Sequence, residues 1–347
     1  MPTLFDPITL GDIDCANRIF MAPMTRSRAG DGDTPTEMNA HYYGQRASSG
    51  LIITEGVYPN FDGKGYVRTP GIVTEAQIAG WKQVAEAVHA KGGKIVMQLM
   101  HCGRVASLHN KPKGSRTLAP SAIQAKGEMY TDAAGMQPHD MPEEMTLAEI
   151  EQTISDFGQA AKNAVEAGCD GVELHCTSGY LPAQFLSTGT NKRNDRYGGA
   201  LENRLRFVVD VLSAMIAKIG AGRVGIRICP GNPFNDLSDE NPEETFKALI
   251  EKINPMSRAY LHVIRMKAGV DNIELAKSFT GPVILNDSYD LERGNRALMQ
   301  GQADAISFGR HYVANPDLVE KFREGRELAK PDYKTLYTPG PKGYVDY

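Results

Sequence analysis

Short apolar segments alternate with longer amphipathic segments along the 347 residues of the chain. Eight of the apolar segments have the length of strands, at residues 19–23, 51–54, 94–99, 171–175, 224–228, 260–264, 282–285 and 304–308. None alternates cleanly between apolar and polar residues, which is typical of parallel strands that are covered on both faces. The pattern therefore predicts a largely parallel sheet.

The amphipathic segments between these strands carry the start signals of helices. A capping box satisfies free N–H groups of the first turn, and an Asn-Pro pair supplies a capping amide and removes one of those N–H groups. Such signals stand at residues 74–77, 146–149, 241–242 and 315–316. In the helix that follows Thr146, apolar residues recur at helical spacing until Gly168 ends it.

Eight strand–helix repeats predict an α/β fold, a (β/α)8 TIM barrel, formed as a single domain over residues 1–347. A doubly wound sheet is the alternative, but no Gly-x-Gly-x-x-Gly follows the first strand. The opening segment, with a turn at Gly11-Asp12, is expected to be an N-terminal β-hairpin that closes the barrel floor. Residues 100–145, after the third strand, are too long for an ordinary loop and are expected to form a loop subdomain or lid.

Composition and charge narrow the range of partners. A net charge of −4 and a pI of about 6.1 give no indication of nucleic acid or an anionic membrane as a partner. The sequence contains no apolar run of transmembrane length, and its first residues lack the pattern of a signal peptide. The five cysteines include no Cys-x-x-Cys pair, so free thiols in a reducing cytoplasm are expected.

Polar residues gather where the predicted strands end, which is the active-site face of such a barrel. They are Thr25, Glu55, Gln98, His101, His175, Tyr180 and Arg227. The eighth strand is followed by Gly309 and Arg310, near the usual phosphate site of this fold, where a guanidinium can bind anionic oxygens. No metal-binding motif and no Gly-x-Ser-x-Gly are present. Hydrogen-bond donors together with an anion-binding pair, Gly309 and Arg310, are more typical of a site for a phosphorylated aromatic cofactor than of the active site of a hydrolase.

Longer motifs make a family resemblance specific. They include "NRIFMAPMTRSRA" (17–29), "YYGQRASSGLIITEG" (42–56), "GGKIVMQLMHCGR" (92–104), "FLSTGTNKRNDRYGGALENRLRF" (185–207) and "FGRHYVANPDLVEKF" (308–322). The chain resembles the old yellow enzyme family of FMN-dependent NAD(P)H ene-reductases over nearly its whole length. Within that family it is similar to the N-ethylmaleimide, morphinone and glycerol trinitrate reductases.

The resemblance implies non-covalent FMN as the cofactor and NAD(P)H as the electron donor. Thr25 would bind the flavin C4 carbonyl, Gln98 the pyrimidine edge, and Arg227 the N1 and O2 side, where reduced flavin carries negative charge. The remaining cofactor-binding residues that the resemblance implies are Pro23, Met24, Gly56, His175, Ser288, Gly309 and Arg310.

The resemblance also implies the substrate and the reaction. His175 would donate to the carbonyl of an α,β-unsaturated substrate, and Tyr180 would protonate its α-carbon after hydride transfer from flavin N5. Ser178, Tyr66, Met100 and Tyr344 would complete the substrate pocket. The protein is thus expected to be an NADPH dehydrogenase or enoate reductase, a monomer or homodimer whose partners are small enones.

Four positions depart from the family pattern. Ser178 stands where the family has Asn or His, and its hydroxyl reaches less far than an amide. Met100 replaces a tryptophan, which softens the pocket wall. Asp287 and Ser288 stand where glycine usually brings backbone to the phosphate, so Asp287 is expected to be unfavourable there unless it points away.

Two other functions remain as alternatives. A barrel enzyme acting on phosphorylated sugars would use the same phosphate site, but it would need a lysine or carboxylate base at a strand end. Lys94 opens its strand and Lys267 lies beyond the sixth, so this alternative is weak. A flavin- or ligand-binding relative with a decayed substrate site would explain Ser178, Met100 and Ser288.

Overall fold

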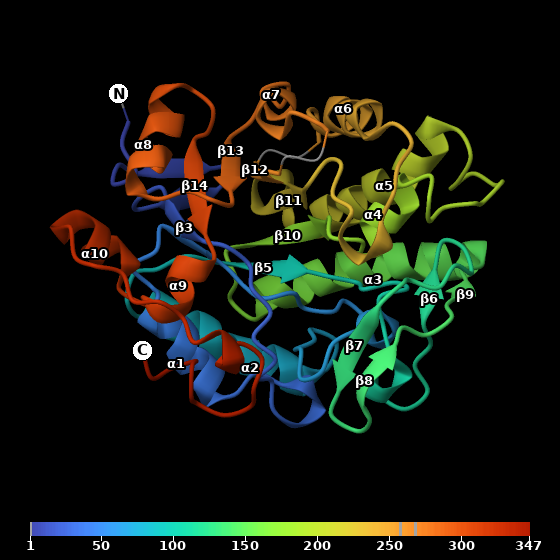
Figure 1. Cartoon of the computed structure of the whole chain (residues 1–347), viewed down its shortest axis with the longest axis horizontal. Coiled ribbons are helices and arrows are strands. Elements are labelled where there is room, and N and C mark those ends of the chain that lie inside the picture. Colours follow the sequence, from blue (N-terminus) through green and yellow to red (C-terminus); the bar gives the residue numbers. More distant parts are fainter. Residues whose placement is uncertain (1, 257–258, 267–268) are drawn as a thin grey trace.

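The computed structural model describes residues 2–256, 259–266 and 269–347, so Lys267 lies outside the described residues. Its centre is a closed barrel of eight parallel strands in the order β10-β11-β12-β13-β14-β3-β4-β5 (Figure 1). The strands are β3 (Ile19–Met21), β4 (Leu51–Ile53), β5 (Ile95–Leu99), β10 (Gly171–Cys176), β11 (Val224–Ile228), β12 (Tyr260–Ile264), β13 (Val283–Asn286) and β14 (Ala305–Phe308). All eight predicted strands and the barrel are confirmed.

Helices cover the outside of this barrel. They are α1 (Glu37–Gln45), α2 (Glu75–His89), α3 (Leu147–Glu166), α4 (Leu181–Leu186), α5 (Leu201–Ile219), α6 (Pro242–Ile253), α7 (Asn272–Ala276), α8 (Leu291–Met299), α9 (Arg310–Ala314) and α10 (Leu318–Glu324). Short 3-10 helices include η5 (Phe234–Asp236) and η6 (Tyr333–Thr335).

The predicted helix starts are confirmed in three of four places. The side chains of Thr74, Thr146 and Asn241 cap α2, α3 and α6. The prediction for Asn315 is wrong, because Asn315 follows the last residue of α9, and α10 begins only at Leu318 with Asp317 at its N-cap position. Its side chain instead binds the backbone of Ala329, with Nδ2 donating to the carbonyl and Oδ1 accepting from the N–H.

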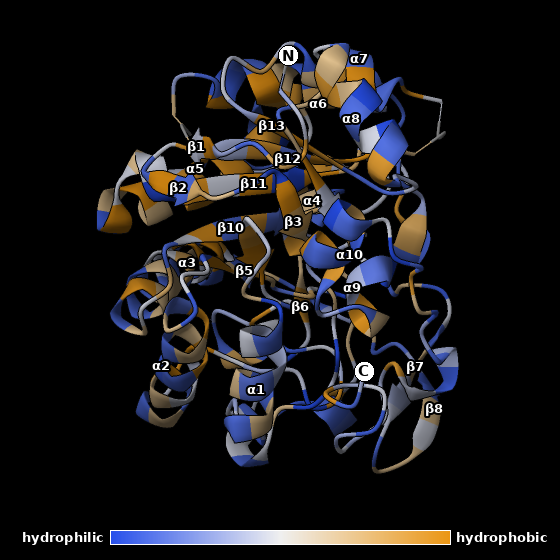
Figure 2. Cartoon of the chain, turned by 90° about the vertical axis from the view of Figure 1, so that its left-hand side faces the viewer, coloured by the Kyte–Doolittle hydropathy of each residue, from blue (hydrophilic) through white to orange (hydrophobic). Residues whose placement is uncertain are grey.

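The barrel strands are buried on both faces, but the two faces differ in chemistry. On β10, Val172 and Leu174 belong to the apolar core shared with the helices. Residues that alternate with them along the strand, Glu173 and His175, point the other way because successive side chains of a strand alternate in direction. Figure 2 shows largely apolar strands inside helices that carry both apolar and polar residues. The interior of the barrel can therefore hold polar groups while its outer face stays apolar.

A β-hairpin closes the floor of the barrel, as predicted. Strands β1 (Ile8–Leu10) and β2 (Ile13–Cys15) pair antiparallel. Leu10 and Ile13 pack in one buried cluster with inward side chains such as Phe20. At the turn, a Cβ on Gly11 would lie 2.3 Å from the carbonyl oxygen of Gly222, so only glycine allows this close approach.

The long connection after β5 forms small sheets, as expected of a subdomain. Strand β6 (Leu118–Ala119) pairs with β9 (Glu143–Glu144), and β7 (Glu128–Thr131) forms a hairpin with β8 (Gly135–Pro138). In Figure 2 this second hairpin and the β1–β2 hairpin lie at opposite sides of the molecule.

Two arginines after β3 hold the C-terminal tail against the barrel. The guanidinium of Arg28 donates to the backbone carbonyls of Thr335, Leu336, Gly340 and Lys342, at 2.7–3.0 Å. Arg26 adds bonds to the carbonyls of Leu336 and Gly343 at 3.3 and 2.7 Å. The segment from residue 333 to 344 is thus fixed beside the first strand of the barrel.

Candidate active site

A cavity of about 920 Å³ opens at the carboxyl ends of the barrel strands. Its wall brings together most of the residues singled out from the sequence, although they come from seven strand ends and the loops after them. These are Pro23, Met24, Thr25, Gly56, Gln98, Met100, His175, Ser178, Tyr180, Arg227, Ser288, Gly309 and Arg310.

Tyr344 is not in this wall, which contradicts its expected place in the pocket. It is completely buried, its ring stacks on Tyr42 at 4.0 Å, and Asn39 donates to its hydroxyl. Arg26 and Arg28 lie over the same ring, at 5.1 and 4.7 Å from its centroid. Tyr344 therefore anchors the C-terminal tail, and no face of it is left for a substrate.

Tyr66, Glu55 and His101 also lie outside the wall. The hydroxyl of Tyr66 lies 3.1 Å from that of Tyr180, so Tyr66 stands behind the cavity and contacts it through its neighbour. Glu55 accepts from the backbone N–H of Arg26, and Nδ1 of His101 accepts from that of Gly103. The last two side chains hold loops in place.

His175 and Tyr180 lie next to each other in the wall. Their rings meet edge to face at 4.9 Å. Burial, with Arg227 nearby, lowers the pKa of His175 to about 3, so the imidazole is neutral. Its Nδ1 is buried without a hydrogen-bond partner. Burial raises the pKa of Tyr180 well above its usual value, so its phenol keeps its proton. The pair thus combines a neutral imidazole with a protonated phenol.

Ser178 lies between them in an unusual backbone conformation. Its φ of +56° is left-handed, and Gly179 follows with +76°. The amide of Asn235 donates to the carbonyl of Ser178 at 2.7 Å, which ties this turn to η5. A Cβ on Gly179 would come within 2.8 Å of Asn235, so glycine is required there.

A buried polar layer forms the bottom of the cavity, where Gln98, Arg227 and Asn286 line it, and continues beneath it. Arg227 donates to Oδ1 of Asn286 at 2.7 Å and contacts His262, and Gln98 donates to Glu173 at 2.7 Å. The sequence prediction included Gln98 and Arg227 but missed Glu173, His262 and Asn286. A signal was present, because Glu173 and His262 are polar residues inside apolar strands, and Glu173 precedes His175 by two positions.

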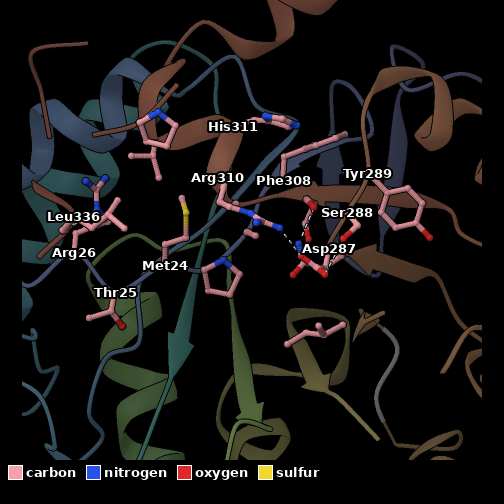
Figure 3. Close-up of a pocket in the computed structure, with 18 of the residues that line it drawn as sticks. Met24, Thr25, Arg26, Asp287, Ser288, Tyr289, Phe308, Arg310, His311 and Leu336 are labelled. Carbon is pink, nitrogen blue, oxygen red and sulfur yellow. Dashed lines mark hydrogen bonds and ion pairs between the residues drawn. The ribbon is translucent and has the colours of Figure 1, made fainter. Parts of the chain in front are cut away.

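Asp287 lies at the end of the cavity formed by Gly309 and Arg310, where an anion was expected to bind. Its carboxylate would have to point away from Arg310 to leave that site free, but it does not. Arg310 donates to Oδ1 of Asp287 at 3.1 Å, and Ser288 donates to Oδ2 of the same carboxylate (Figure 3). Asp287 and Ser288 have φ values of +77° and +62°, so both hold the left-handed backbone that glycine adopts without strain. A Cβ on Gly309 would make only ordinary van der Waals contacts, at 3.6–4.0 Å with Met24 and Ala22, and both Gly309 and Arg310 line the cavity.

Aromatic side chains form the outer rim and were not predicted. Phe234, Tyr333 and Tyr337 line the cavity while 58–63% of each remains exposed. They come from η5, η6 and the tail, where no strand pattern shows which loop residue faces the cavity. The described residues include no cluster of three or more His, Cys, Asp or Glu side chains that could hold a metal ion.

Comparison with known proteins identifies the family. The family model described as "NADH:flavin oxidoreductase / NADH oxidase family" matches residues 3–329. The chain belongs to this family of FMN-dependent old yellow enzymes.

Relatives support this assignment over the full length of the chain. A probable flavin mononucleotide-dependent alkene reductase of Leishmania infantum is 39% identical, covering 99% of this chain and 96% of that protein. A putative 12-oxophytodienoate reductase 5 of Oryza sativa subsp. japonica is also 39% identical, covering 97% of this chain and 92% of the relative.

Solved structures of the same family have the same fold. Morphinone reductase superposes with a TM-score of 0.95 at 43% identity, covering all of this chain and 96% of that one. An old yellow enzyme homologue from Zymomonas mobilis gives 0.95 at 40% identity and covers 99% of its chain.

As a member of the old yellow enzyme family, the protein is an oxidoreductase that uses FMN and a nicotinamide donor. The cavity fits FMN in its chemistry. It offers Gln98 and Arg227 at the barrel end, and the backbone of Gly309 with the guanidinium of Arg310 in the wall at the anion end. Among the helices of the described residues, none is long and apolar enough to cross a membrane.

The buried histidines predict how stability depends on pH. Burial lowers the pKa of His101 and His175 to about 3 and that of His262 to about 4. Between these values and about 6.5 the unfolded chain binds more protons, so stability rises with pH across that range. Burial raises the pKa of Glu55 to about 7 and also raises that of Asp210, and these two groups act in the opposite direction.

We therefore expect the melting temperature of the cofactor-free protein to fall as pH decreases from 6.5 to 4. His101→Gln should reduce this slope, because the protonation step of one buried histidine is lost at a residue outside the cavity wall. Differential scanning fluorimetry at several pH values measures the slope. An unchanged slope in a folded His101→Gln protein would contradict this assignment.

Proposed function

We propose that this protein is an FMN-dependent ene-reductase that reduces activated C=C bonds of α,β-unsaturated carbonyl compounds with NAD(P)H. The observation that carries the proposal is the pairing of neutral His175 with protonated Tyr180 in the wall of one cavity, beside Gln98 and Arg227. Bound FMN would supply the hydride chemistry, with the nicotinamide as the hydride source and the β-carbon of the substrate as the acceptor.

The chain would hold the cofactor through two groups of residues. Thr25, Gln98 and Arg227 would bind the polar edge of the flavin ring, with Pro23, Met24 and Gly56 along it. Ser288, Gly309 and Arg310 would bind the phosphate through a backbone N–H and a guanidinium. Met100 fills the space that Gly56 leaves, since a Cβ on Gly56 would lie 2.5 Å from the Met100 methyl carbon.

His175 and Tyr180 would act on the substrate at different atoms. His175 donates a hydrogen bond to the carbonyl oxygen, where negative charge develops, and a preorganised donor there contributes roughly 3–4 kcal/mol. Tyr180 delivers its proton to the α-carbon, which contributes about 10²–10⁴-fold in rate. Tyr66 can return a proton to Tyr180 across the 3.1 Å hydroxyl contact.

A binding protein with a decayed substrate site is the second candidate. Ser178 and Met100 favour it, because both stand in the cavity wall in place of the residues usual in the family. The intact His175–Tyr180 pair favours the enzyme.

The first prediction tests Tyr180 as the proton donor. Tyr180→Phe should slow the oxidative half-reaction with 2-cyclohexenone by about 10²–10⁴-fold, because only this half-reaction needs a proton on carbon. Reduction of the enzyme by NAD(P)H should change little. Anaerobic stopped-flow absorbance of the flavin measures both rates. Tyr66→Phe is the matched control and should slow the oxidative half-reaction much less. If Tyr180→Phe slowed the reductive and the oxidative half-reactions equally, Tyr180 would have a structural role.

The second prediction concerns Ser178. Asparagine is well tolerated in left-handed backbone, so Ser178→Asn should fold without added strain at φ +56°. Its longer amide adds a second donor to an oxyanion, which is worth about 1.5 kcal/mol or roughly tenfold in affinity. Titration with p-hydroxybenzaldehyde should show tighter binding, and cyclohexenone should be reduced faster. Ser178→Ala should show neither gain; if Ser178→Asn shows neither as well, serine is an adaptation to another substrate.

The third prediction concerns Asp287. Its carboxylate lies within hydrogen-bond reach of Arg310 and repels a phosphate by about 1 kcal/mol in water-like surroundings. Asp287→Asn should therefore lower the dissociation constant of FMN roughly fivefold, and that of riboflavin hardly at all, as measured by fluorescence quenching. The control Glu292→Gln removes the same charge from α8, where Glu292 pairs with Arg296. A similar gain in that control would mean that net charge alone is responsible.

A further inference from the structure

A carboxylate lies beneath the cavity that the proposed function does not use. Glu173 lies on the inner face of β10, and none of it is exposed. Its Oε1 accepts from Nε2 of Gln98 at 2.7 Å, and its Oε2 lies 2.8 Å from Nδ1 of His262. Gln98 and Arg227 are two of the side chains that would bind the flavin ring. Glu173 contacts Gln98 directly, and its contact with His262 lies on the side of Arg227.

His262 connects Glu173 to Arg227. The Nε2 atom of His262 lies 2.7 Å from Oγ of Ser307 and 2.5 Å from Nη1 of Arg227. The guanidinium can only donate, so Nε2 is the acceptor and Nδ1 carries the proton that it gives to Glu173. Burial, followed by the Arg227 charge, lowers the pKa of His262 to about 4, which keeps the ring in this neutral form. The hydrogen bonds therefore run from Arg227 through His262 to Glu173.

Burying the Glu173 carboxylate removes its hydration, and this loss of free energy is larger than the gain from packing the side chain. An apolar side chain of similar volume would often be as stable in such a place. Burial would raise the pKa of Glu173, yet His262, Arg227 and Gln98 together hold it below its usual value. The carboxylate is thus ionised and is balanced by Arg227, with which it forms a neutral pair across His262.

We propose that Glu173 is a positioning residue that orients Gln98 and Arg227 toward the flavin, and that its charge lowers the reduction potential of the bound cofactor. This rests on the proposed function for the placement of Gln98 and Arg227. A lone Arg227 would stabilise the negative charge of reduced flavin, and Glu173 offsets part of that effect. The reduced cofactor is then a stronger hydride donor to the enone.

Two variants separate the charge of Glu173 from its shape. Glu173→Gln keeps the length of the side chain and removes the charge. It should shift the reduction equilibrium about tenfold toward reduced flavin, which is a rise of about 30 mV for a two-electron couple. Glu173→Asp keeps the charge but withdraws it from Gln98 and His262, and it should raise the dissociation constant of FMN at least tenfold with a smaller change in potential.

The readouts are the midpoint potential from spectroelectrochemistry and the FMN dissociation constant from fluorescence quenching, neither of which depends on enone turnover. Asp170→Asn is the matched control, because it removes one charge just before the same strand, where Asp170 binds Lys94 and the backbone of Ile95. It should change neither quantity. Arg227→Met should weaken FMN binding and lower the potential.

These outcomes separate the proposed cofactor site from the proposed role of Glu173. If Arg227→Met leaves FMN binding and potential unchanged, the proposed cofactor site is wrong. If Arg227→Met acts as expected but folded Glu173→Gln has an unchanged potential, or folded Glu173→Asp binds FMN normally, the role of Glu173 is overturned. Failure of both Glu173 variants to fold would assign the residue to barrel stability alone and would also overturn it.

Discussion

The closed ring of parallel strand pairs is the constraint on which the site depends. Pairing sets His175 beside Arg227 and Arg227 beside His262, and it sets Glu173 beside Gln98 on the other neighbouring strand. Since side chains alternate along each strand, this register places all five on the inner face. If one of these strands slipped by one residue, its inward polar side chains would turn into the apolar layer under the helices. The packing of the core and the geometry of the site therefore both require the same register.

The interior of the barrel changes character along its axis for the same reason. Near the floor the inward residues are apolar, such as Phe20 and Ile284, and they pack against the hairpin β1–β2. One layer further, Glu173 and His262 have no exposed surface and satisfy each other. Beyond them Arg227 and His175 reach the cavity. Polar groups are tolerated at this depth because each layer supplies partners to the next.

The sequence predicted the parts of the molecule that follow from periodicity and motif. All eight strands were found, because apolar runs between helix signals have few other interpretations, and Gln98, His175 and Arg227 follow from their positions near strand ends. Asn315, Tyr344 and Asp287 could not be placed in this way. An Asn-Pro pair fits a cap or a loop equally well, and a tail tyrosine can face a cavity or pack on Tyr42. Whether Asp287 meets Arg310 depends on loop backbone angles that residue type does not determine.

The arginine clamp on the tail has a consequence for biosynthesis. Arg28 binds the carbonyl of Lys342, which is 314 positions away in the sequence. The tail segment that Arg28 holds supplies Leu336 and Tyr337 to the cavity wall. Contacts of such sequence separation form late, because the chain entropy of a very long loop must be lost first. During translation the barrel strands are all available before the part of the rim that the tail supplies. A nascent chain therefore presents an open, incomplete pocket until residue 342 has left the ribosome, and cofactor retention becomes a late event in the life of the molecule.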